Sequence, residues 1–186
     1  EESATLINPA GLAYPGSGYS YQLLDSESRT YKTYQAHYYY NRPIGFSSII
    51  QQDQNGNKLT MTALGLGLLG RNGVSWGVSY KQIEGRINNT AVKGWSSDLG
   101  LLFRLFPWLN MGVNVKDFYS RDLNIDPTFK MGLAGIHPKR HFNWSIEGTY
   151  ETSPSEIIKT GLGLEYDVAD TLRLRGGINQ RTVFYG

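Results

Sequence analysis

The sequence predicts an all-β protein, specifically an antiparallel up-and-down transmembrane β-barrel. In "WSSDLGLLFRLFPWLNMGVNVKDF" (Trp95–Phe118), apolar and polar residues alternate, pause at Pro107 and alternate again. Period-2 alternation is typical of strands with one apolar face. The regular segments are about nine to twelve residues long, the length that tilted strands need to cross a bilayer.

The alternating segments can be placed along the whole chain, which is predicted to form a single domain over residues 1–186. Regular strands are expected at residues 58–69, 73–83, 94–105, 108–118, 127–136, 140–150, 156–166 and 170–180, and less regular strands at 19–25, 31–40 and 43–51. About eleven strands are thus read within residues 19–186. The alternation slips near Ala63 and Leu64, which predicts a bulge or kink at Gly65 or Gly67.

Short and long connections alternate between these segments. Tight turns are predicted at residues 70–72, 106–107, 137–139 and 167–169, and longer polar loops at 52–57, 84–93, 119–126 and 152–155. Short turns on one rim and long loops on the other are the pattern of an outer-membrane barrel.

One set of side chains is predicted to face lipid. These residues are Trp95, Leu99, Leu101, Phe103 and Trp144. Glycine recurs on the opposite, polar side of the strands, where small residues suit a crowded barrel interior. A soluble ligand-binding β-barrel or sandwich also alternates, so it remains an alternative.

Composition excludes several classes of function. The chain carries 18 basic and 16 acidic residues, a net charge of +2, and no basic block that would favour nucleic acid. It has no cysteine, which excludes disulfides, cysteine nucleophiles and cysteine-based zinc sites. We therefore expect no cofactor and no nucleic-acid partner.

Ordered motifs resemble one family. They are "INPAGLAY" (7–14), "SSDLGLLFR" (96–104), "LNMGVNVKDF" (109–118), "PTFKMGLAG" (127–135) and "IIKTGLGLEYDVADTLRLRGGIN" (157–179). Together they resemble the FadL-type outer-membrane barrels and, within these, the PorV-like branch. The resemblance covers nearly the whole chain and implies a location in the bacterial cell outer membrane.

The resemblance also implies an architecture. A barrel of this family has about fourteen strands and an N-terminal segment that forms a partial plug, here residues 1–18. The family's Gly-rich stretch before the motif at residue 7 is absent, and about three more strands would be expected after residue 181. The chain is therefore expected to be truncated at both ends, and the alternative is that another chain closes the wall. Asn8, Pro9 and Ala10 would anchor the plug to the inner wall, whereas the alternative is an ordinary turn before the first strand.

The implied function is transport of a hydrophobic or amphipathic small molecule across the outer membrane. The alternative is an accessory or scaffold subunit of an outer-membrane secretion or surface complex, with other subunits as partners besides the lipid bilayer. Candidate ligand-binding residues of the lumen are Arg104, Lys116, Lys130, Lys159, Arg173 and Arg175. Their positive charge could attract a carboxylate, or they could form internal salt bridges across strands.

Two further motifs do not predict catalysis or metal binding. His141, Asn143 and Ser145 share one strand face, but they spread over about 13 Å, too far for a triad. Residues 53–57 begin like a calcium loop and lack its later glutamate. They contain Asn55-Gly56, a hairpin-turn signal, so a turn is expected instead. We expect neither an enzyme nor a metal site.

Overall fold

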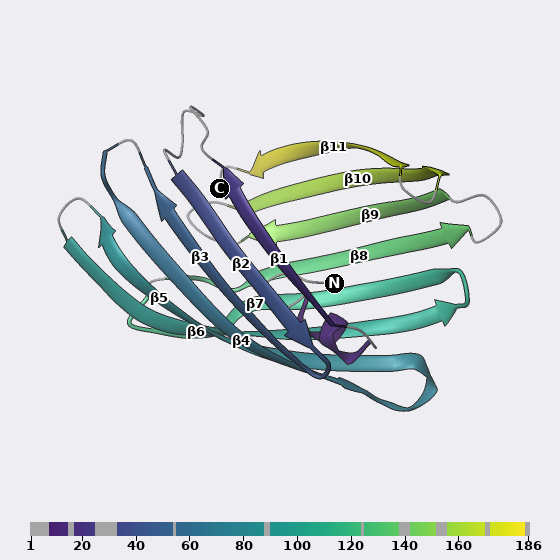
Figure 1. Cartoon of the computed structure of the whole chain (residues 1–186), viewed down its shortest axis with the longest axis horizontal. Helices are drawn as coiled ribbons and strands as arrows, with labels where there is room; N and C mark the ends of the chain where they lie inside the picture. The colour runs from purple at the N-terminus through teal and green to yellow at the C-terminus, as the bar shows by residue number, and fades with distance from the viewer. Residues whose placement is uncertain are drawn as a thin grey trace.

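The computed structural model describes residues 8–14, 17–24, 33–53, 55–87, 90–123, 125–137, 142–151, 156–169 and 172–184. Within these ranges eleven strands form one antiparallel sheet in which each strand lies beside its neighbours in sequence (Figure 1). The predicted all-β, up-and-down architecture is confirmed. Strands β1 and β11 are the two edges of the sheet, which is therefore open.

Each predicted segment overlaps one observed strand, and several strands extend beyond the predicted bounds. The strands are β1 (Ser17–Leu24), β2 (Thr33–Asn41), β3 (Ile44–Gln52), β4 (Lys58–Leu69), β5 (Val74–Ile87), β6 (Thr90–Phe106), β7 (Leu109–Arg121), β8 (Thr128–His137), β9 (Phe142–Glu151), β10 (Glu156–Ala169) and β11 (Leu172–Phe184). Two short 3-10 helices, η1 (Pro9–Ala13) and η2 (Arg71–Gly73), are the helical elements of the described ranges.

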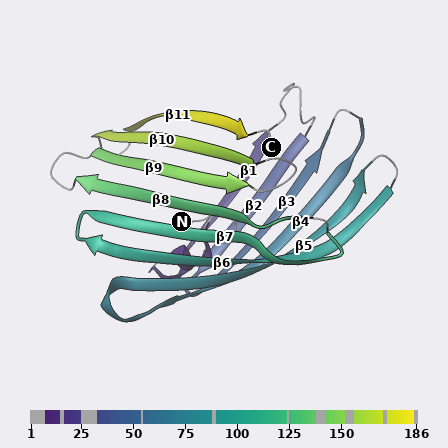
Figure 2. The ribbon, with the colours of Figure 1, turned by 180° about the vertical axis from the view of Figure 1, so that it is seen from behind.

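The sheet is strongly twisted and curved. In Figures 1 and 2, β1–β5 run at a steep angle to β7–β11, and η1 lies against one face of the wall. Helix η1 contacts β4, β5 and β6. We call the face that carries η1 the inner face and the opposite one the outer face.

Over the middle of β5 and β6 the inner face is polar and buried, whereas the outer face is apolar and exposed. Ser75, Ser96 and Asp98 of the inner face are each 0% exposed, whereas their outer-face neighbours Trp76 and Leu99 are 43% and 42% exposed. Successive side chains of a strand point to opposite faces. The alternation of the sequence therefore separates the two sets of side chains on β5 and β6.

Two predicted connections are wrong. Residues 84–87 and 90–93 of the long loop expected at 84–93 are strand, because β5 and β6 stay paired from Val74–Phe103 to Ile87–Thr90. Residues 88–89 lie outside the described residues. Cross-strand pairs such as Glu84 with Lys93 extend the ladder through residues whose polarity suggested a loop. The turn expected at residues 167–169 belongs to β10, which has an irregular register between Asp167 and Ala169.

The bulge predicted at Gly65 or Gly67 is also wrong. Strand β4 pairs with β5 in an unbroken register through both glycines, and with β3 in an unbroken register as far as Leu66. The apparent slip arises because the inner face is apolar at this end of the strand. Met61 and Ala63 pack there in a cluster with Ala36, Tyr38 and Ile49. A local change in the polarity of one face thus imitated a change of register.

Candidate functional site

The plug segment, which we define as residues 8–13, folds locally around Asn8. The Oδ1 atom of Asn8 accepts a hydrogen bond from the Ala10 backbone N–H at 3.1 Å, and this caps η1. Pro9 follows at the first helical position, where its fixed φ suits a helix and its missing N–H costs nothing. The sequence Asn-Pro-Ala therefore encodes a compact turn of 3-10 helix.

Three inner-face glycines receive the plug segment. Gly67, Gly77 and Gly100 are consecutive cross-strand partners on β4, β5 and β6. A Cβ on Gly77 would lie 2.3 Å from the Pro9 carbonyl carbon, and one on Gly100 would lie 2.1 Å from Asn8 Oδ1. Neither position has room for a side chain. We call these three residues the glycine seat.

Polar and apolar contacts both hold the plug segment on the wall. The Nδ2 group of Asn8 donates to the carbonyl oxygens of Leu101 and Val113, each at 3.3 Å. Leu12 is 0% exposed and packs with Tyr40 of β2. Contacts to β2, β6 and β7 tie the segment to strands far apart in sequence. The structure places Asn8, Pro9 and Ala10 against the inner wall, and their anchoring role remains a prediction.

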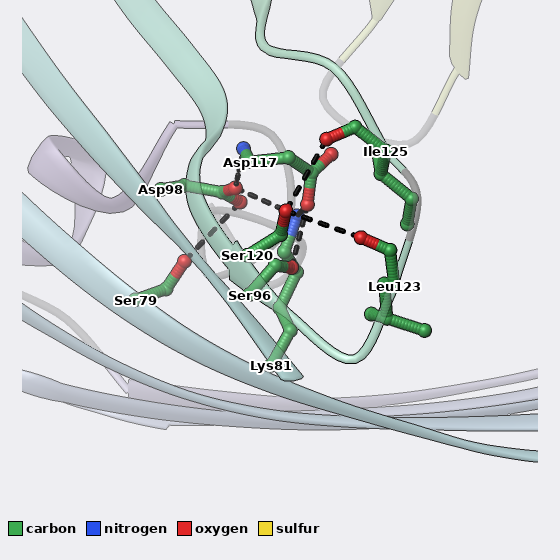
Figure 3. Close-up of polar contacts among 8 residues, drawn as sticks. All are labelled: Ser79, Lys81, Ser96, Asp98, Asp117, Ser120, Leu123 and Ile125. Atoms are coloured by element: carbon green, nitrogen blue, oxygen red, sulfur yellow. Dashed lines mark hydrogen bonds and ion pairs between the residues drawn. The ribbon is translucent and has the colours of Figure 1, made fainter. Parts of the chain in front are cut away.

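A charged network lies buried on the inner face (Figure 3). Lys81 Nζ lies 2.6 Å from Asp98 Oδ1 and 2.6 Å from Asp117 Oδ1. Ser79 donates to Asp98 at 3.3 Å, and Ser96 donates to Asp117 at 2.6 Å. The side chains of Lys81 and Asp98 are 7% and 0% exposed. Pairing and hydrogen bonding offset the cost of burying these charges.

The network supports a bulge in β7. The ladder pairs on either side of the bulge are Ser97 with Tyr119 and Leu99 with Val115. Between them Asp98 alone opposes residues 116–118, and Asp117 adopts a φ of 55°. The Asp117 N–H donates to Asp98 Oδ1 at 2.8 Å, so the buried carboxylate satisfies a backbone donor that the ladder leaves unpaired. Sequence reasoning missed Asp117, although Lys116-Asp117 interrupts the alternation.

The connection after β7 folds back over β6. Ser120 Oγ donates to the carbonyl oxygens of Leu123 and Ile125 at 3.4 and 3.2 Å (Figure 3). Gly94 of β6 meets this connection, because a Cβ there would lie 2.5 Å from Leu123 Cγ. The bulge and its network thus sit where the chain turns inward toward the lumen.

The four predicted cations whose side chains the structure describes do not form one site. Arg104 lies beside Gly73 near the β4–β5 turn and is exposed. Lys116 is part of the β7 bulge. The Cα atoms of Arg173 and Arg175 pair with Asp167 and Glu165, while their side chains lie outside the described part of the structure.

Lys130 and Lys159, in contrast, share a cavity of about 250 Å³ with Glu147 and Glu151. Lys159 Nζ lies 2.6 Å from Glu151 Oε1, so this cation is engaged in an internal ion pair. Lys159 thus fits the alternative of an internal salt bridge. Lys130 is in none of the ion pairs of the described residues, so its charge fits the alternative of attracting a carboxylate.

A second cavity, of about 220 Å³, lies directly beside the plug segment. Asn8 forms one wall and Lys130 another. Its remaining lining comes from β6 to β9 and includes Leu102, Asn110, Gly112, Gly132, Ala134 and Glu147. Small residues leave the space open, and amides and charges line part of it. We call this space the plug-side cavity.

The residues predicted to face lipid lie on the outer face. Trp95 is flanked by Tyr80 and Tyr119, with ring centroids 5.5 and 5.1 Å apart. Trp144 covers Gly135, where a Cβ would lie 2.2 Å from the indole Nε1. Leu99, Leu101 and Phe103 follow Trp95 along β6 with the same parity. Contact of these residues with lipid remains a prediction.

The predicted turn at residues 53–57 is present in the described residues. Asp53 Oδ1 accepts the backbone N–H groups of Asn55 and Asn57, each at 2.8 Å, and Asp53 Oδ2 accepts the Asn57 side-chain amide at 2.7 Å. The bond from the Asn57 side chain is the main cause that lowers the pKa of Asp53 below its ordinary value. The oxygens of Asp53 thus hold the turn.

No metal-binding cluster emerges in the ranges that the structure covers. His141 lies outside the described residues, and Asn143 donates to Glu165 Oε1 at 2.9 Å. Within those ranges no three His, Asp or Glu side chains come together as metal ligands would. Among the same residues, no helix has the length and apolar content to cross a membrane.

The glycine seat predicts that bulk at Gly77 displaces the plug segment. Because the chain lacks cysteine, Ala10→Cys, a position that is 0% exposed, can report on displacement through maleimide labelling. We expect slow labelling in the parent and fast labelling after Gly77→Val. Gly148→Val is the matched control, since a Cβ there meets nothing within 4 Å. Equal labelling rates in all three proteins would refute the seat.

The buried network predicts a large effect of Lys81→Met. Removing the ammonium leaves two carboxylates uncompensated, which lowers the free energy of unfolding by about 3–5 kcal/mol. Neutralising both partners as well, with Asp98→Asn and Asp117→Asn, restores part of the loss.

The control is Arg121→Gln, which removes the exposed ion pair with Asp122 at 3.8 Å and changes the free energy of unfolding by no more than about 0.5 kcal/mol. Urea unfolding of the folded protein in detergent measures the free energy of unfolding of the parent and of each variant. A Lys81→Met effect as small as the control's would contradict the structural role of the network.

Comparisons with known proteins bear on the fold. No family model matches the sequence, and no curated protein matches it. Among solved structures, the crystal structure of the Pseudomonas putida toluene transporter TodX is similar, with a TM-score of 0.59 and 11% identity, over 97% of this chain and 79% of that chain. The chain thus has a FadL-like β-barrel fold, and the match does not bear on the PorV-like branch.

Proposed function

We propose that the chain forms the wall and plug of an outer-membrane transporter for a hydrophobic or amphipathic small molecule. The observation that supports this proposal most strongly is that polar side chains are buried and apolar side chains are exposed, the reverse of a soluble protein. Asp98 is fully buried on the inner face, whereas Leu99, the next residue, is 42% exposed outside. An exposed apolar face of this extent is typical of a surface that contacts a membrane or partner.

The spacing of aromatic pairs supports a bilayer as the surroundings of the outer face. Trp95 contacts Tyr80 in a tilted arrangement within β6, and Phe106, the last residue of β6, stacks on Trp108 with ring centroids 5.6 Å apart. The strand between Trp95 and Phe106 is about 36 Å long. Tilted by about 45°, it covers a depth of roughly 25 Å, the height of the apolar band of outer-membrane barrels.

The plug-side cavity supports passage of a small molecule. It lies between the plug segment and the inner wall, and Lys130 and Asn110 give it polar groups beside apolar ones. The TodX structure is described as that of a toluene transporter. We therefore propose a monoaromatic hydrocarbon as the first apolar probe and a long-chain fatty acid as the first amphipathic one.

Uptake by cells tests this proposal. The chain is expressed in the outer membrane of a Gram-negative host that lacks its own transporter of this kind, and entry of both radiolabelled probes is measured. We expect uptake of at least one probe above vector level. Ala134→Trp, which fills the plug-side cavity, lowers that uptake toward vector level, whereas Leu99→Trp on the outer face leaves it unchanged.

The outcome also separates transport from the alternative role. A protein that reaches the outer membrane in folded form and yet gives vector-level uptake of both probes contradicts transport. A second protein that co-purifies with it in fixed proportion would then favour the accessory or scaffold function.

A further inference from the structure

A basic groove lies on the outer face at the far end of the β5–β6 hairpin. It has a volume of about 610 Å³ and draws its lining from β4, β5, β6 and the turn before β4. The charged side chains that line it are Lys58, Glu84, Arg86 and Lys93. All four are exposed, and three of them are cations. The groove therefore offers concentrated positive charge.

The parity of the strands places these cations outside the lumen. Lys58 shares its face with Leu64 of β4, and Arg86 shares its face with Trp76 and Tyr80 of β5. Lys93 has the parity of Leu99 on β6. The ladders of β5 with β4 and β6 are unbroken, so these faces do not change along the hairpin. The cations are thus separate from the lumenal lysines.

The pairing of these cations is unfavourable without a counter-ion. Lys58 and Arg86 are direct cross-strand partners, and like charges in that position destabilise a sheet. Within the described residues, none of the ion pairs includes Lys58, Arg86 or Lys93. Glu84 opposes Lys93 in the ladder and leaves a surplus of positive charge. An anion between the strands would relieve this repulsion.

The distance of the groove beyond the aromatic level of the wall indicates which kind of anion it would meet. Trp95 pairs with Gln82, so Lys93 and Arg86 lie two and four residues beyond the aromatic level of the wall. These steps span about 7 and 13 Å of strand, or roughly 5 and 9 Å of depth at a 45° tilt. The polar headgroup layer of a bilayer begins at the aromatic belt and is about 5–8 Å thick.

We propose that Lys58, Arg86 and Lys93 bind the phosphate of a membrane lipid headgroup in the leaflet at the β5–β6 tip. Arg86 donates a planar fork of N–H groups to the phosphate oxygens, and the two lysines add point charges. The proposal rests on the membrane location in the proposed function. It assigns the lipid to the outer surface and requires no contact with the transport path.

Lipid binding to the full chain in detergent tests the site. Native mass spectrometry compares phosphatidic acid with diacylglycerol, which lacks the phosphate, and with inorganic phosphate. We expect phosphatidic acid to bind and diacylglycerol not to bind. Lys58→Gln with Arg86→Gln weakens binding about 25-fold, at about fivefold for each cation near a lipid surface. Lys58→Arg with Arg86→Lys keeps most of the affinity.

Arg71→Gln is the control for loss of an exposed cation elsewhere, because Arg71 lies in η2 at the opposite rim, and we expect it to leave the affinity unchanged. Equal affinity for phosphatidic acid in the parent and the double glutamine variant would overturn the proposal. So would inorganic phosphate that binds as tightly as the lipid, because it would identify a site for the free anion. Membrane fractionation is read separately, so a protein absent from the outer membrane refutes the proposed function rather than the binding chemistry.

Discussion

The constraint on which the structure depends is that neighbouring side chains of a strand must leave opposite faces of the sheet. In this chain it sends serine, asparagine, lysine and aspartate to the side that carries η1 and sends leucine, tryptophan and phenylalanine away from it. A soluble protein buries its apolar set, but here Asp98 is buried and Leu99 is exposed. The fold is stable with this polarity only if the outer face meets an apolar environment.

The buried polar face is packed in two ways. First, Gly67, Gly77 and Gly100 have no side chain, so the backbone of the plug segment can approach the sheet directly. The second way is internal pairing, as in the Lys81–Asp98–Asp117 network, which satisfies charges and supports the β7 bulge. Both means fix the interior without a large hydrophobic core. They leave cavities beside the plug segment that apolar side chains would otherwise fill.

Sequence patterns predicted the fold better than the site. Alternation located eight strands through regular segments and three more through less regular ones, and all eleven are present in the sheet. The pattern failed at Gly65 and Gly67, where an inner-face apolar cluster around Met61 imitated a bulge. It also failed at residues 84–93, where polar residues continue a ladder beyond the aromatic level of the wall.

The site required information that a single strand does not hold. The six candidate cations share the polar parity, but the register separates Arg104 from Lys130 and brings Lys130 beside Lys159. The glycine seat depends on partners in three strands and on a segment more than fifty residues away in sequence. Asp117 became part of the network only through a bulge with positive φ.

Spin-label accessibility along β6 in a bilayer tests the central claim most directly. Single cysteines at residues 99, 101, 102, 103 and 104 are labelled with a nitroxide, and collisions with dissolved oxygen are compared with those of a water-soluble nickel complex. This set avoids the buried Asp98 and the closely packed Gly100. We expect high oxygen accessibility at Leu99, Leu101 and Phe103 and low values at Leu102 and Arg104. Oxygen accessibility that is high at the even positions, or uniform along the strand, would contradict the assignment of the outer face to lipid.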